Sequence, residues 1–87
     1  MRFQGSVIKE QGVTFAVVVV KKNVLDNHSE ADRMIRAFYQ VFPGVPIVLM
    51  AQNYSGVPSY YGRSDIVRFL ANIPMESIPW KEYSVNI

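Results

Sequence analysis

Cysteine is absent from this 87-residue chain, and histidine occurs only once, as His28. The absence of cysteine excludes disulfide bonds, cysteine-ligated zinc and thiol catalysis. Any serine–histidine–aspartate triad would have to use His28. The glycines stand singly, outside any phosphate-binding or dinucleotide-binding motif. Because groups for catalysis and cofactor binding are scarce, we expect no catalytic residue, no cofactor and no metal ion.

Long apolar runs are also missing, although 49% of the residues are hydrophobic. The longest run, 15–20, is far shorter than the roughly 18–20 residues that span a membrane. The first residues lack the long apolar core of a secretory signal. These features predict a single globular domain that is cytoplasmic and does not contact a membrane.

An excess of one charge is lacking too. Nine Lys and Arg residues stand against seven Asp and Glu residues, which gives a formal net charge of +2. The basic residues are scattered, and Lys21–Lys22 is the only adjacent pair. A dedicated nucleic-acid-binding domain usually has a clustered basic surface, so this pattern does not favour one.

Four segments have the composition of β-strands, namely 3–8, 13–20, 45–52 and 57–61. Gly12 lies in a turn that joins the first two strands into an antiparallel hairpin. The segment 13–20 is apolar on both of its faces, which predicts a central strand that is covered on both sides. Pro58 predicts that the fourth strand lies at an edge of the sheet, because proline cannot donate a backbone hydrogen bond.

Two segments have the periodicity of amphipathic helices. The first begins at Ser29, which we expect to cap it, and ends before Pro43. The second begins at Ser64, also expected as a cap, and ends at Pro74. Their apolar stripes consist of Ala31, Met34, Ile35, Phe38 and Tyr39 in the first helix and of Ile66, Phe69, Leu70 and Ile73 in the second.

The order of these elements predicts an α+β domain, a two-layer sandwich with ββαββα connectivity. We expect a mixed four-stranded sheet in the order 1-2-3-4 with both helices on one face. Residues 1–74 would form the domain, and 75–87 would be a C-terminal tail that packs on it and offers a fifth short strand. This arrangement leaves the second sheet face partly bare, to be covered either by the tail with Trp80 or by a second subunit.

The segment 53–65 is the most distinctive part of the sequence. It contains Tyr54, Tyr60 and Tyr61, followed by Arg63 just before a helix start. Tyrosine is common in interfaces because its ring is apolar and its hydroxyl forms hydrogen bonds. With Trp80, these residues are our candidate binding site. The alternative is a structural hairpin in which either Tyr60 or Tyr61 faces the core.

Three functions are compatible with these features. The leading prediction is a non-catalytic interaction module that self-associates as a homodimer or docks on a protein partner. The alternative is a nucleic-acid-binding module that uses exposed tyrosines and basic side chains. Its candidate residues are Arg33, Arg36, Arg63 and Arg68. The third and least favoured prediction is a small enzyme with His28 as general base, close in sequence to Asp26, Ser29, Glu30 and Asp32.

Overall fold

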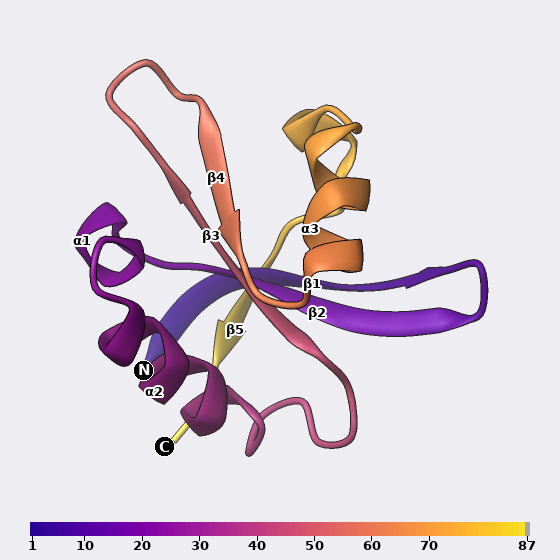
Figure 1. The fold of residues 1–87 in the computed structure, drawn as a ribbon. Helices are drawn as coiled ribbons and strands as arrows, with labels where there is room; N and C mark the ends of the chain where they lie inside the picture. The colour runs from indigo at the N-terminus through magenta and orange to yellow at the C-terminus, as the bar shows by residue number, and fades with distance from the viewer. Residues whose placement is uncertain (87) are drawn as a thin grey trace.

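A five-stranded mixed sheet crosses the middle of the molecule, with helices on either side of it (Figure 1). The computed structural model describes residues 1–86. Along the chain the elements are β1 (Arg2–Glu10), β2 (Val13–Val19), α1 (Lys22–Leu25), α2 (His28–Phe38), β3 (Ile47–Gln52), β4 (Pro58–Tyr61), α3 (Ser64–Ala71), the 3-10 helix η1 (Met75–Ser77) and β5 (Lys81–Ser84). The strands lie in the order β4-β3-β2-β1-β5. The α+β class, the ββαββα order and the mixed sheet are thus confirmed.

The pairing of the strands follows the predicted pattern. β1 and β2 form an antiparallel hairpin, closed by a turn in which Gln11 and Gly12 have positive φ. β2 and β3 are parallel, and β3 and β4 are antiparallel. The tail adds β5, which pairs antiparallel with residues 2–5 of β1. As expected from Pro58, β4 is an edge strand.

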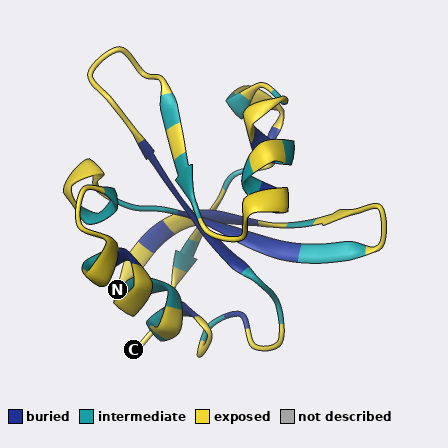
Figure 2. Ribbon diagram, viewed as in Figure 1, coloured by how far each residue is buried: buried dark blue, intermediate teal, exposed yellow. Residues whose placement is uncertain are grey.

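The core lies on both faces of the sheet, in two separate clusters. On one face, Ala16, Val18 and Leu49 pack with Phe38 of α2. On the other face, alternate residues of the same strands pack with α3 and with Ile78. This second set consists of Phe15, Val17, Val48, Met50, Ile66 and Leu70. Figure 2 shows the buried residues concentrated where the strands cross, with the hairpin ends exposed.

The prediction that both helices cover one face, as in a two-layer sandwich, is therefore wrong. α2 and α3 lie on opposite faces, so the molecule has three layers with the sheet in the middle. The physical reason is that β2 has apolar side chains on both of its faces, so each face must be buried against another element. α3 covers the face that we expected to be bare, and Ile78 and Trp80 pack beside it. Within residues 1–86, each face of the sheet thus packs against a helix of the same chain.

The helix starts also differ from prediction. Asn27, rather than Ser29, caps α2, and its side chain accepts a hydrogen bond from the backbone N–H of Glu30. Ser64 is the first residue of α3 and forms no capping bond, because the cap position is held by Arg63. The last residue of the predicted tail, Ile87, lies outside the described residues. Within 1–86, no helix is long and apolar enough to cross a membrane.

Candidate functional site

The tip of the β3–β4 hairpin, residues 53–57, is held by a dense set of hydrogen bonds. The Asn53 side-chain oxygen accepts from the backbone N–H groups of Ser55, at 2.9 Å, and Val57, at 3.0 Å. The Gln52 side chain donates to the Gly56 carbonyl at 3.0 Å. Gly56 takes φ +79°, a conformation that glycine adopts without steric cost. The tip is therefore a defined turn in which side chains fix the backbone.

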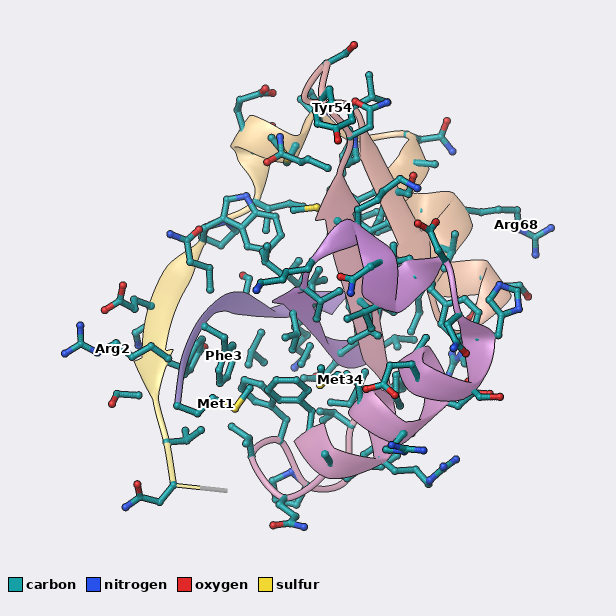
Figure 3. The ribbon with its side chains drawn as sticks, turned by 90° about the vertical axis from the view of Figure 1, so that its left-hand side faces the viewer. Met1, Arg2, Phe3, Met34, Tyr54 and Arg68 are labelled. Atoms are coloured by element: carbon teal, nitrogen blue, oxygen red, sulfur yellow. The ribbon has the colours of Figure 1, made fainter. Side chains whose placement is uncertain are left out.

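This turn presents two apolar side chains to solvent. Tyr54 is fully exposed and Val57 is 55% exposed. Figure 3 shows Tyr54 at the far end of the hairpin, away from the core. A hollow lies beside it, lined by Lys22 and Asp26 and by Gln52, Asn53 and Tyr54 of the hairpin. Since Tyr54 belongs to neither core cluster, packing within the domain does not account for it.

Tyr60 and Tyr61 point to opposite faces of the sheet. Tyr61 packs on the α2 side and Tyr60 on the α3 side. We expected either that both tyrosines belong to a binding site or that one of them faces the core. Because both faces of the sheet are covered, each of them contacts a core cluster. The Tyr60 hydroxyl is buried with no hydrogen-bond partner among the described residues, and burial raises the pKa of this phenol. Tyr60 is therefore part of the packing rather than of an exposed binding surface.

Replacing Tyr60 by phenylalanine is expected to leave stability unchanged or raise it by about 1 kcal/mol. The reason is that an unpaired buried hydroxyl costs about 1–3 kcal/mol, and the Tyr60→Phe change removes it while keeping the ring. Urea denaturation followed by circular dichroism measures the difference. Destabilisation by more than about 1 kcal/mol would mean that the hydroxyl has a stabilising partner.

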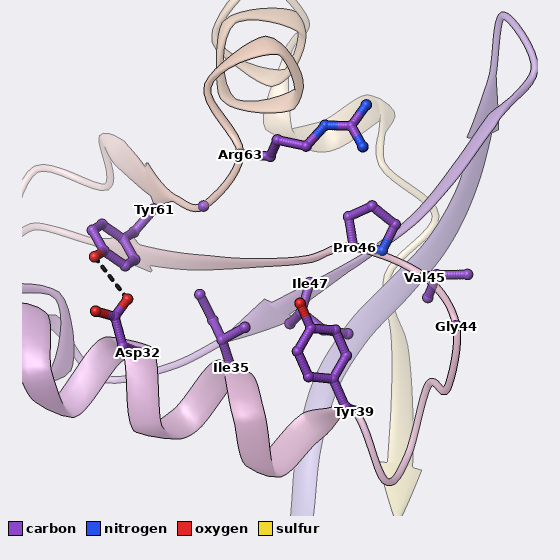
Figure 4. A pocket seen from close by; sticks show the side chains of 10 residues that line it. Asp32, Ile35, Tyr39, Gly44, Val45, Pro46, Ile47, Tyr61 and Arg63 are labelled. Carbon is purple, nitrogen blue, oxygen red and sulfur yellow. Dashed lines mark hydrogen bonds between the residues drawn. The ribbon is translucent and has the colours of Figure 1, made fainter.

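A groove of about 560 Å³ lies where β4 ends, between α2 and the start of β3. Tyr61 donates its hydroxyl to the Asp32 carboxylate at 2.8 Å, which Figure 4 shows at one end of the groove. This hydrogen bond is the main cause of the raised pKa of Tyr61. Tyr39 lies further along α2, and Arg63 lines the opposite wall. The remaining lining residues are Ile35, Gly44, Val45, Pro46, Ile47 and Gly62.

Arg63 is held by its neighbour Asp65. The guanidinium Nε donates to one carboxylate oxygen at 2.7 Å, and Nη2 donates to the other at 2.8 Å. This hydrogen-bonded pair lowers the pKa of Asp65 from 3.8 to about 2. Both side chains are about half exposed. Arg63 is thus orientated before any ligand arrives, and an anion would have to compete with Asp65.

The lowered pKa of Asp65 gives a pH-dependent prediction. A carboxylate with a lowered pKa in the folded state stabilises the fold above its unfolded pKa, and this contribution is lost as the pH falls through the folded pKa. The stability difference between the wild type and Asp65→Asn should therefore be full at pH 7 and shrink between about pH 4 and pH 2. Urea denaturation across this range measures it. Glu76→Gln is the control, and a pH-independent difference would contradict the prediction.

Trp80 is a structural residue in this fold. Its indole N–H donates to the Met75 carbonyl at 3.1 Å, and its ring packs with the cluster on the α3 side. This contact fixes the chain between η1 and β5. Trp80 lines neither the groove nor the hollow beside the hairpin tip, and among the other four candidates only Tyr60 belongs to its cluster. The structure therefore does not bring the five predicted binding residues into one site.

The arginines of the nucleic-acid alternative are also separated. Arg33 and Arg36 belong to α2, whereas Arg68 belongs to α3 on the other face of the sheet. Figure 3 shows Arg68 pointing into solvent. Arg33 forms an ion pair with Glu30 at 3.5 Å. These arginines could share one basic surface only if both helices lay on the same face of the sheet. The nucleic-acid alternative therefore stays a prediction, and the helix arginines do not form the shared surface on which it was based.

His28 is exposed at the start of α2 and does not line the groove. Its ring lies 4.8 Å from the ring of Tyr61, in a tilted arrangement. Among residues 1–86, no group of three or more His, Cys, Asp or Glu side chains is placed to hold a metal ion. Around His28 the structure shows packing against the Tyr61 ring and the Asn27 cap of α2.

Sequence reasoning missed several of these residues. The sequence pattern places Tyr39 in an apolar helix stripe and Asp32 near His28, and only the fold brings both into one groove with Tyr61. The role of Asn53 could be predicted from its neighbours. An asparagine followed closely by Ser55 and Gly56 is typical of a turn in which the asparagine side chain bonds to the backbone. Comparison of the chain with protein-family models, curated proteins and solved structures gives no match.

Proposed function

We propose that this domain is a non-catalytic interaction module that docks on a protein partner through the tip of its β3–β4 hairpin. The observation that carries the proposal is the full exposure of Tyr54 on a turn held by the Asn53 and Gln52 side chains. Tyrosine is enriched among the hot-spot residues that contribute most of the binding energy of protein interfaces. A turn that is already ordered loses little conformational entropy when it binds.

The covered sheet favours docking over self-association through a bare face. Both apolar faces are occupied by the domain's own helices, so a second copy is not needed to bury them. Tyr54 and Val57 are exposed apolar side chains at the tip of this hairpin, and the hairpin projects from the sheet (Figure 1). A projection of this kind fits a partner with a concave apolar pocket and a hydrogen-bond acceptor for the tyrosine hydroxyl.

Site-specific photo-crosslinking in the cells that make the protein tests this proposal. A benzophenone amino acid replaces Tyr54 in one variant and Val7 in a control variant. Val7 is a suitable control because it is 47% exposed and lies on β1, away from the hairpin. We expect one discrete protein adduct from position 54 that is absent from position 7. An adduct of twice the chain's mass would identify self-association instead, and no adduct, or the same adducts from both positions, would overturn the proposal.

Affinity measurements with the captured partner then quantify the contribution of Tyr54. Tyr54→Ala should weaken binding at least about 30-fold, because changing a hot-spot residue to alanine costs about 2 kcal/mol of binding free energy or more. Val7→Ala should leave the affinity within about twofold of the wild type. Similar affinities for the Tyr54→Ala variant and the wild type would show that the hairpin tip is not the docking element.

A further inference from the structure

The groove at the end of β4 has apolar walls and one carboxylate at its end. Ile35, Val45 and Ile47 contribute its aliphatic surface. Asp32 and Tyr61 close it on one side, and the Tyr39 ring lies further along α2 (Figure 4). The groove is separate from the hairpin tip, because the tip lies before the first residue of β4, whereas the groove is lined by Tyr61, the last residue of β4, and by Arg63 beyond it.

Two charged side chains of opposite sign line this groove, Asp32 and Arg63, and only Arg63 has a charged partner. Arg63 is neutralised by two hydrogen bonds to Asp65. Asp32 has only an uncharged partner, the hydroxyl of Tyr61, and forms no ion pair within the described part of the chain. Arg36 stands four residues along α2, at the spacing that permits an Asp–Arg pair, yet the Asp32 carboxylate bonds to Tyr61 instead. The unneutralised charge in the lining is therefore negative.

A long basic side chain complements this arrangement. Lysine and arginine have an apolar stem that packs along aliphatic surface while the charged end stays near solvent. The charged end is attracted both to a carboxylate and to the face of a tyrosine ring. The phenol of Tyr61 remains a hydrogen-bond donor to Asp32, so one of the two carboxylate oxygens is already used and the other is available.

We infer that the groove binds a lysine or arginine side chain of a partner protein. The stem lies along Ile35, Val45 and Ile47, and the cationic end pairs with Asp32 beside the Tyr61 ring. This site is independent of the hairpin tip, so either can fail its test without affecting the other. Protein partners with a basic residue in an exposed segment satisfy the requirement.

Nuclear magnetic resonance titration with short peptides tests the inference on the intact chain. The probe is acetyl-Gly-Ala-Arg-Ala-Gly-amide, compared with the same peptide carrying lysine, glutamine or glutamate at its centre. We expect the arginine or the lysine peptide to shift the amide resonances of Asp32, Ile35, Val45 and Tyr61 with a saturable dependence on concentration. Absence of saturable shifts up to about 10 mM basic peptide, or equal binding of the glutamine or glutamate peptide, would overturn it.

Two charge-removing variants make the test specific. Asp32→Asn keeps the shape of the side chain and should weaken binding of the basic peptide about tenfold, the cost of one charge-assisted hydrogen bond. Glu76→Gln removes an equal charge from η1, on the other face of the sheet, and should change nothing. Unchanged affinity in Asp32→Asn, or an equal loss of affinity in both variants, would show that the groove does not bind a basic side chain through Asp32.

Discussion

The Phe38→Ala variant is expected to lose about 3–5 kcal/mol of unfolding free energy, the cost of removing a fully buried aromatic side chain. Phe38 is 1% exposed and attaches α2 to the sheet. Its ring meets that of Phe3 edge-on, with 4.8 Å between the centroids.

A loss of this size is a large part of the total stability. Domains have roughly 0.05–0.15 kcal/mol of stability per residue, which is about 4–13 kcal/mol for this chain, so the variant should lose at least about a quarter of its stability. Urea denaturation followed by circular dichroism measures it. Tyr54→Ala is the matched control, since it removes an exposed aromatic ring and should change stability by less than about 0.5 kcal/mol. Losses below about 1 kcal/mol in Phe38→Ala would show that α2 is not anchored in this way.

The second large effect is expected for Gly5→Ala in β1. A Cβ atom at this position would lie 2.8 Å from the Val17 carbonyl oxygen and 3.3 Å from a ring carbon of Phe3. Because the nearest atom is backbone, the neighbouring strand would have to move. β1 is paired on both sides here, with Val18 of β2 and Lys81 of β5, so the movement would disturb two ladders.

We expect Gly5→Ala to cost about 2–3 kcal/mol, in the range of other overpacking changes, and to lower the melting temperature by roughly 10–20 °C. Without the close contact, alanine in a strand would instead be more stable than glycine by about 0.5–1 kcal/mol. Differential scanning calorimetry shows whether the melting temperature falls or rises. Gln4→Ala, at the exposed neighbouring position, is the control. An unchanged or raised melting temperature would contradict the close contact of β1 with β2.

The course of the strands could be predicted from the sequence, but the layering could not. The two apolar faces of Val13–Val20 indicated cover on both sides, and α2 and α3 provide it. A helix's periodicity shows that it has one apolar stripe, but it does not show which face of a sheet that stripe meets. That choice depends on the path of the chain through Gly62 and Arg63 between β4 and α3, and local sequence does not determine this path.

The candidate site divides in the same way. The tip of the hairpin is built by contacts between near neighbours, such as Asn53 with Ser55 and Val57, and it lies where the predicted strands 45–52 and 57–61 meet. The groove depends on Asp32 and Tyr61, which lie 29 residues apart. Arg36 lies on the same helix at the spacing of an ion pair with Asp32, but the placement of α2 against β4 offers Asp32 the tyrosine hydroxyl instead.

The central claim is that the hairpin holds Tyr54 in a fixed, exposed position before any partner binds. Backbone ¹⁵N order parameters for residues 53–57, compared between the wild type and Asn53→Ala, test it most directly. In the wild type we predict values of about 0.8 or higher, those of rigid backbone, because the Asn53 and Gln52 side chains hold the turn. In Asn53→Ala the values should fall towards about 0.6, with the core strands unaffected. Wild-type values below about 0.6, or no difference between the two proteins, would contradict the claim.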